Sequence, residues 1–160
     1  MTGVQTCALP ICANSSKEEA ARVREIYDDL LRQEFVDKNG ESRRVTSDNI
    51  LVVAPYNLQV AMLRRVLPEN AKIGTVDKFQ GQEAEVVIVS MATSSSTDMP
   101  RNLEFLFSKH RLNVAISRAK SLAVVVASPR LLQTPCSTPE QMELVNILCC
   151  VAQQDCAIAD

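Results

Sequence analysis

The residues that follow Ser16 repeat in the manner of an amphipathic helix. Ser16 and Glu19 fit a capping box, the pattern in which a serine caps a helix three residues before an acidic side chain. Apolar side chains then recur at intervals of three and four residues, at Ala20, Val23, Ile26, Tyr27, Leu30 and Leu31. This pattern predicts a helix over residues 17–35. The polar stretch over residues 37–48, which contains an Asn-Gly pair, is predicted as a loop.

Short apolar runs alternate with helical periods along the rest of the chain. The runs at 50–54, 72–75, 85–91 and 122–127 are predicted as buried strands. A helical period covers residues 56–66, and a second helix is predicted between the last two strands. Thr138-Pro139, a cap followed by a first-turn proline, opens a final helix that runs to about residue 151. This alternation predicts an α/β fold with a parallel sheet covered by helices on both faces.

Length and charge limit the class of protein further. A chain of 160 residues with 46% apolar side chains suffices for one domain around a single core. The net charge is −2 and the isoelectric point is about 5.5, so any contact with nucleic acid must be local. No apolar run approaches the roughly 20 residues that cross a bilayer. We therefore expect a cytoplasmic protein with no membrane partner.

The six cysteines raise the question of a metal site, although none shows the paired spacing of a zinc site and no signal peptide precedes them. The candidates are Cys136, Cys149, Cys150 and Cys156. The neighbours of the Cys149-Cys150 pair form one apolar helical pattern, made by Met142, Leu144, Val145, Leu148 and Val151. Reduced, buried thiols are ordinary in such a helix. We therefore expect no metal site.

The first eleven residues, MTGVQTCALPI, have neither a helical nor a strand period. They match the translation of a sequencing-library adapter read from a GTG start, whose last base would open the codon of Cys12. Our hypothesis is that residues 1–11 are an artefact or a disordered tail without structure or function. The domain would then cover residues 12–153, followed by a tail over 154–160. Resequencing the locus from intact genomic DNA tests this hypothesis, because finding these codons in the chromosome would refute it.

Three polar segments border the predicted strands in a fixed order. Residues 54–59 (APYNLQ) follow the first strand, and residues 74–83 (GTVDKFQGQE) connect the second strand to the third. Residues 112–120 (LNVAISRAK) carry Arg118 just before the last strand. Together, these segments resemble motifs IV, V and VI of superfamily 1 helicases of the Upf/Dna2 type. The resemblance covers residues 14–151, and it is closest to bacterial proteins that join a RecB-like nuclease to this motor.

The resemblance implies a RecA-like fold of the P-loop NTPase type, in the part of it that lacks the P-loop. The sequence has no GxxxxGK[ST] phosphate loop and no strand that ends in paired acids. Phosphoryl transfer needs both, and often an arginine that meets the charge developing on the γ-phosphate. The implied role is the second RecA-like domain of an ATP-dependent helicase, which closes over ATP and Mg²⁺ held mainly by a first RecA-like domain. By itself this chain is expected to be inactive, and whether it counts as an enzyme stays open.

Arg118 is the arginine finger that the resemblance implies, because a guanidinium facing an interdomain cleft can bind two phosphate oxygens at once. The alternative is an ordinary surface arginine on a helix. The family assigns four further residues to the nucleotide side, namely Gln80, Gly81, Gln82 and Glu83. Glu83 would contact the ribose or Arg118, and Gly81 permits a close backbone approach or a positive φ.

Tyr56 and Gln59 stand at a strand-to-helix junction, where an aromatic face and amide groups can meet a nucleotide or a base. Tyr56 could equally pack in the core. The resemblance implies contacts with a bound strand at Thr75, Thr93 and Arg111. Thr93 stands where many relatives have an arginine, and packing is the alternative role for Arg111. The implied partner is single-stranded nucleic acid, with DNA expected ahead of RNA.

The rival interpretation is a non-catalytic module, a degenerate RecA-like domain that binds nucleic acid or protein and hydrolyses nothing. Val60 stands where some relatives carry a second arginine, so Arg118 is the one finger expected in this chain. The upstream coding sequence separates the two interpretations. A Walker A lysine and a Walker B acid pair there would favour the motor.

Overall fold

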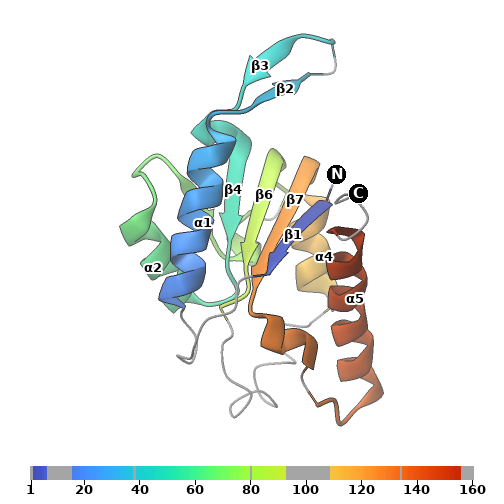
Figure 1. Ribbon diagram of the computed structural model, residues 1–160. Helices are drawn as coiled ribbons and strands as arrows, with labels where there is room; N and C mark the ends of the chain where they lie inside the picture. Colours follow the sequence, from blue (N-terminus) through green and yellow to red (C-terminus); the bar gives the residue numbers. More distant parts are fainter. Residues whose placement is uncertain are drawn as a thin grey trace.

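The computed structural model describes residues 2–6, 16–37, 39–79, 81–92, 109–133 and 135–155. Its centre is a five-stranded sheet in which all neighbours run parallel, in the order β1-β7-β6-β4-β5 (Figure 1). The strands are β1 (Thr2–Thr6), β4 (Ile50–Val53), β5 (Lys72–Gly74), β6 (Ala84–Ser90) and β7 (Ala119–Ala127). Each apolar run of the sequence lies in a strand. The predicted RecA-like α/β fold is therefore confirmed.

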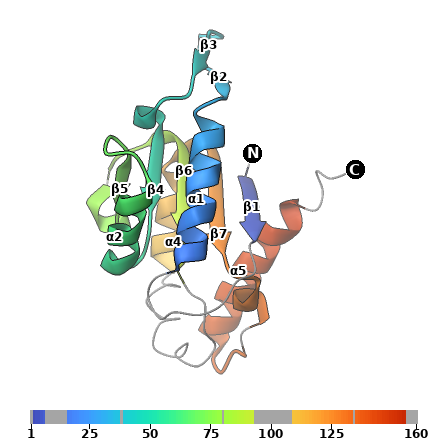
Figure 2. The same cartoon turned by 60° about the vertical axis from the view of Figure 1, so that its left-hand side comes forward.

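Helices cover both faces of the sheet (Figure 2). The helices α1 (Lys17–Leu30) and α2 (Asn57–Val66) pack on one face with Ile50, Val52, Val86 and Ile88 of the strands. The helix α4 (Lys109–Ser117) packs on the other face with Leu51, Val53, Val87 and Val89. The last helix, α5 (Pro139–Asp155), lies beside β1. Three short 3-10 turns complete the described chain: η1 (Ser47–Asn49), η2 (Val76–Phe79) and η3 (Pro129–Gln133).

The first helix is shorter than predicted, because α1 ends at Leu30 rather than at residue 35. Beyond it, the Gln33 carbonyl accepts a hydrogen bond from the Val45 N–H at 3.0 Å. The chain then continues as β2 (Glu34–Val36), which pairs antiparallel with β3 (Ser42–Arg44). The stretch predicted as a loop is therefore largely a hairpin, which extends beyond the amino ends of the sheet strands (Figure 1).

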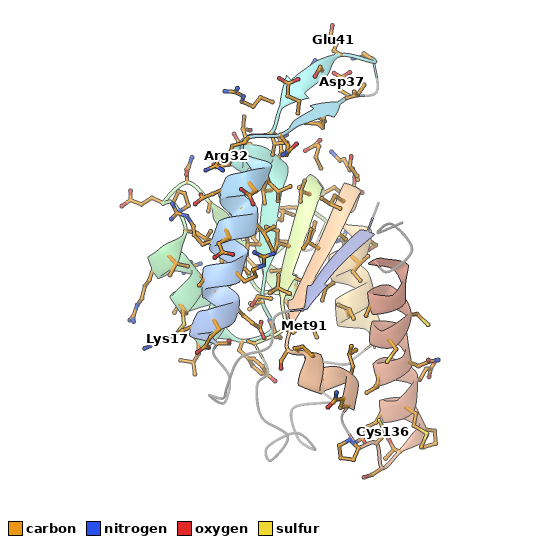
Figure 3. The ribbon with its side chains drawn as sticks, in the orientation of Figure 1. Lys17, Arg32, Asp37, Glu41, Met91 and Cys136 are labelled. Atoms are coloured by element: carbon orange, nitrogen blue, oxygen red, sulfur yellow. The ribbon has the colours of Figure 1, made fainter. Side chains whose placement is uncertain are left out.

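Asp37 organises the tip of this hairpin, where Figure 3 labels it together with Glu41. Its Oδ1 accepts hydrogen bonds from the backbone N–H groups of Asn39 at 2.8 Å and Glu41 at 3.0 Å. Its Oδ2 lies 2.9 Å from Arg43 Nε. The hydrogen bond from Glu41 is the main cause that lowers the pKa of Asp37, and the Arg43 charge adds to it. The Asn-Gly pair of the sequence thus marks a hairpin turn, with Gly40 at a φ of 81°.

The structure differs from the hypothesis that residues 1–11 have no structure. Thr2–Thr6 form an edge strand that pairs in parallel register with Ala123–Ala127 of β7. The backbone can supply these hydrogen bonds whatever the side chains are, so an absent side-chain period did not exclude a strand. The strand satisfies an edge of β7 that would otherwise be open. The adapter origin of the segment stays a prediction.

Deleting residues 1–11 is expected to lower the free energy of unfolding by about 1 to 2 kcal/mol, because the ladder between β1 and β7 is lost. The open β7 edge should also cause self-association that rises with concentration. Urea unfolding and light scattering measure the two effects. Val4→Pro, which removes one N–H from β1, should reproduce part of the loss. If the deleted chain were as stable as the full chain and stayed monomeric at every concentration, residues 2–6 would contribute no strand.

Candidate nucleotide and nucleic-acid site

The parallel sheet separates the predicted site residues into two groups. Tyr56 and Thr75 follow the carboxyl ends of β4 and β5, which lie level with each other because Val53 pairs with Gly74. Glu83 and Arg118 instead precede the amino ends of β6 and β7. We call these the carboxyl edge and the amino edge. The edges are separated along β6 by about 16 Å, the rise of five residues of parallel strand.

Arg118 lies at the amino edge, one residue beyond the end of α4. The turn into β7 begins there. Its N–H donates to the Ala115 carbonyl at 3.3 Å, and its own carbonyl accepts from the Ala84 N–H at 3.0 Å. The backbone of Arg118 is thus bonded to both α4 and β6. A rigid backbone is what a side chain needs to meet a ligand in one geometry.

Arg118 as a residue is half-buried. Its Nε is buried and has no hydrogen-bond partner among the described residues, and the side chain forms no ion pair there. A permanently charged group that is partly removed from water gains most from an anionic partner. The position of Arg118 therefore suits an oxyanion supplied from outside the described part of the chain.

The turn before β6 brings Gln82 and Glu83 to the same edge. Gly81 has a φ of 81°, which glycine adopts without strain, and the Gln82 N–H donates to the Phe79 carbonyl at 3.0 Å. Nothing lies within 4 Å of a Cβ built on Gly81, so within the described chain it is the positive φ that favours glycine here. Gln82 and Glu83 are exposed. Glu83 directly precedes Ala84, whose N–H donates to the Arg118 carbonyl. Gln80 lies outside the described residues.

Glu85 is the next carboxylate after Glu83, and it already has partners within the chain. Asn49 Nδ2 donates to its Oε2 at 3.0 Å, and Lys120 Nζ lies 3.6 Å from its Oε1. Burial by itself raises the pKa of Glu85, but the hydrogen bond from Asn49 and the nearby Lys120 charge outweigh it and lower the pKa. Glu85 lies one residue after Ala84, whose N–H donates to the Arg118 carbonyl. Its carboxylate is nevertheless bound by Asn49 and Lys120.

Tyr56 and Thr75 form the carboxyl-edge group. Tyr56 is the residue before α2, is half-buried and packs against the apolar cluster on the α4 face. Burial raises the pKa of the Tyr56 phenol. Thr75 is half-buried between β5 and η2, and its carbonyl accepts from the Lys78 N–H at 3.1 Å. Part of the Tyr56 ring thus packs in the core, as the alternative interpretation held, while part stays accessible.

Gln59 is in the interior, and its prediction as a nucleotide contact is contradicted by its surroundings. The side chain is 0% exposed. Its Oε1 accepts from the Ser16 N–H at 2.8 Å, and its Nε2 donates to Ser90 Oγ at 3.0 Å and to the Ser16 carbonyl at 3.3 Å. All its polar atoms have internal partners. Gln59 therefore joins α2 to α1 and β6 instead of facing a ligand.

The capping box at the start of α1 is only half formed. Ser16 Oγ accepts from the Glu19 N–H at 3.1 Å, as predicted. The reciprocal bond is replaced, because the Ser16 N–H donates to Gln59 and the Glu19 carboxylate reaches the end of β6 instead. Sequence reasoning missed Ser90 as a polar partner of Gln59 and Glu19 as a partner of Ser90. The available signal was one serine, Ser90, at the end of an apolar strand.

Thr93 lies outside the described residues, as does the side chain of Arg111, whose backbone opens α4. Among the described residues, no group of three or more His, Cys, Asp or Glu side chains could hold a metal ion. Cys136, Cys149 and Cys150 form no disulfide within the described part of the chain. None of the described helices has the length and apolar character that a membrane span requires.

Comparison with known proteins agrees with this arrangement. Residues 12–130 match the family AAA_12, described as an AAA domain. The chain is 32% identical over 129 residues to the DNA replication ATP-dependent helicase/nuclease JHS1 of Arabidopsis thaliana, covering 80% of this chain and 9% of the relative. It is 44% identical over 81 residues to the DNA polymerase alpha-associated DNA helicase A of Schizosaccharomyces pombe, covering 49% of this chain and 12% of the relative.

A third relative is the RNA helicase Mov10l1 of Mus musculus, which is 37% identical over 103 residues, or 59% of this chain and 9% of the relative. The chain thus spans about a tenth of the length of these relatives. The family match covers most of the chain, including both edges of the sheet. The chain belongs to the AAA domain family.

Proposed function

We propose that this chain is the second RecA-like motor domain of a superfamily 1B, ATP-dependent helicase. The observation that carries the proposal is Arg118, a half-buried residue on a fixed backbone, whose buried Nε has no hydrogen-bond partner among the described residues. The helicase relatives and the AAA family match support it. The kinship to bacterial proteins with a RecB-like nuclease belongs to the same proposal, and it rests on the sequence motifs alone.

The amino edge would face the nucleotide. Arg118 fits the negative charge of a triphosphate, and a guanidinium there stabilises charge that develops on the transferred phosphoryl group. Glu83, exposed one residue from the Arg118–Ala84 bond, can accept a hydrogen bond from a ribose hydroxyl. ATP would supply the phosphoryl group, and Mg²⁺ would be held with it mainly by a first RecA-like domain. Gln80, Gly81 and Gln82 belong to the same proposed nucleotide side.

The carboxyl edge would contribute to the track for single-stranded nucleic acid. Thr75 follows β5 there and can bond a backbone phosphate, while Tyr56 offers part of a ring to a base or nucleotide. Thr93 and Arg111 are proposed as further strand contacts. The names of the relatives include both DNA and RNA helicases, so they support a nucleic-acid partner without favouring DNA.

The isolated 160-residue chain is expected to show no ATP hydrolysis, with or without single-stranded nucleic acid, because it has no phosphate loop. The full-length protein that contains it should hydrolyse ATP and respond to a single strand. A coupled phosphate-release assay on both proteins, with the upstream coding sequence in hand, makes the test. Hydrolysis by the isolated chain would contradict the proposal. A full-length protein that binds strand without turnover would favour a degenerate module.

A further inference from the structure

A buried carboxylate connects α1 to the end of β6 at the carboxyl edge. Glu19, in the first turn of α1, is 4% exposed. Its Oε2 accepts a hydrogen bond from Ser90 Oγ at 2.9 Å and another from the Ala92 N–H at 2.8 Å. Figure 3 labels Lys17, at the start of α1, and Met91, just past the end of β6, towards the same end of the sheet. The carboxylate therefore holds the chain where it leaves β6.

The same network reaches the chain that leaves β4. Ser90 Oγ also accepts from Gln59 Nε2 at 3.0 Å, and Gln59 is in the first turn of α2, three residues after Tyr56. Ser16, Gln59 and Ser90 are all buried. Through them, the exits of β4 and β6 share one set of hydrogen bonds with α1. A buried hydrogen-bond network of this kind restricts the backbone around it.

Ala92 has a φ of 54°, the only positive φ of a non-glycine residue in the described ranges. An L-amino acid with a Cβ is strained there, and such a residue persists only where its surroundings hold it. The Ala92 N–H is held by Glu19. The side chain of Ala92 is 0% exposed, so the turn is also packed in place.

We infer that Glu19 is a positioning residue for the strand-binding edge: it holds Ala92 in the left-handed conformation and, through Ser90 and Gln59, fixes the turn that carries Tyr56. A buried carboxylate is costly, and apolar packing could hold α1 on the sheet as firmly. What apolar packing does not provide is an acceptor for the Ala92 N–H. The inference rests on the proposed function only in taking the carboxyl edge as the surface that binds nucleic acid.

The positioning itself is tested by NMR of the 160-residue chain. In the wild type, the Ala92 amide should be protected from hydrogen exchange and its carbon shifts should report a left-handed residue. Glu19→Ala should remove both signs. Glu19→Gln, which keeps an acceptor oxygen, should retain them. If Glu19→Ala does not fold, Glu19→Asp serves instead, because its carboxylate is one methylene too short to reach Ala92.

The consequence is tested by fluorescence anisotropy with labelled oligo-dT and oligo-U. Glu19→Ala should bind about tenfold more weakly than the wild type, and Glu19→Gln should stay within about twofold. Adding Ala92→Gly to Glu19→Ala should recover about half of the loss on a logarithmic scale, since glycine adopts the positive φ unaided. A residue that serves stability alone would lower the melting temperature without changing the affinity of the folded fraction.

Two results would overturn the inference. One is an unprotected Ala92 amide in the wild type. The other is a Glu19→Ala affinity equal to that of the wild type. A wild-type chain that binds neither oligonucleotide would refute strand binding by this edge, and with it the role of Glu19 in binding. The amide measurements would still decide whether Glu19 positions Ala92, so the two failures remain distinct.

Discussion

Replacing Arg118 by alanine in the full-length protein should lower kcat for ATP hydrolysis by a factor of about 10³ to 10⁵. The affinity for ATP should change little, because a finger of this kind acts mainly on charge that develops in the transition state. The variant should keep the fold, since both hydrogen bonds described for Arg118 use its backbone. Steady-state turnover with a single-stranded activator and equilibrium binding of a fluorescent nucleotide measure the two quantities.

Two further variants test whether the loss of turnover is specific to the guanidinium of Arg118. Arg118→Lys keeps a positive charge but loses the planar fork, so it should restore only a small part of the turnover. Arg65→Ala removes an exposed arginine of α2 that has no ion pair among the described residues, and it should leave turnover unchanged. Near wild-type turnover of Arg118→Ala would refute the proposed role. Loss of ATP binding together with turnover would assign Arg118 to the ground state instead.

The surroundings of Arg118 explain why it has no internal anionic partner among the described residues. An internal carboxylate that paired with it would neutralise it. Glu85, on the strand to which Arg118 is bonded, is held by Asn49 and Lys120 instead. Glu83 is exposed and forms no ion pair among the described residues. The amino edge thus leaves the Arg118 guanidinium without an anionic partner in the described part of the chain, while the neighbouring carboxylates are paired or exposed.

Four of the five strands of the sheet, all but β1, could be predicted from the sequence because apolar runs are typical of strands buried on both faces. A run such as Ile50–Val53, with all four residues buried, is apolar at every position and is bounded by Pro55. In a small α/β domain, such a run is stable as a strand of a parallel sheet that helices cover on both faces. The hairpin β2–β3 could not be predicted this way, because it lies outside the core. Val36 on it is 69% exposed, so its apolar character did not indicate burial.

The site was predicted only as a set of residue types in order along the chain. Motif order indicated Arg118 and Glu83, and the structure brings their backbones to one edge through the Ala84–Arg118 bond. The order of the motifs could not show that Tyr56 and Thr75 follow the opposite ends of the strands. Gln59 was misassigned because its partners, Ser16 and Ser90, are 43 and 31 residues away in sequence. Polar contacts over such separations leave no periodic signal.

Gly74→Val should lower the free energy of unfolding by about 3 kcal/mol, the upper end of the cost of overpacking a core. Gly74 ends β5, and a Cβ there would lie 2.6 Å from Lys78 Cδ and 3.1 Å from Phe79 Cε2. Lys78 is an exposed side chain whose Nζ donates to the Ile73 carbonyl at 3.4 Å, so moving it away costs that hydrogen bond. Phe79 is 5% exposed and belongs to the core, so it can move little. Urea unfolding followed by circular dichroism measures the loss.

The two contacts can be separated, because only one of them is with a flexible side chain. Gly74→Ala should cost less than the valine, and adding Lys78→Ala should recover the share due to the 2.6 Å contact while the contact with Phe79 remains. Gly40→Ala is the matched control: its Cβ would meet nothing within 4 Å, so only its φ of 81° costs stability, about 1 kcal/mol. If the urea concentration at the unfolding midpoint were the same for Gly74→Val as for the wild type, the turn that carries Thr75 would not pack closely. Its placement beside the proposed nucleic-acid track would then lose its physical basis.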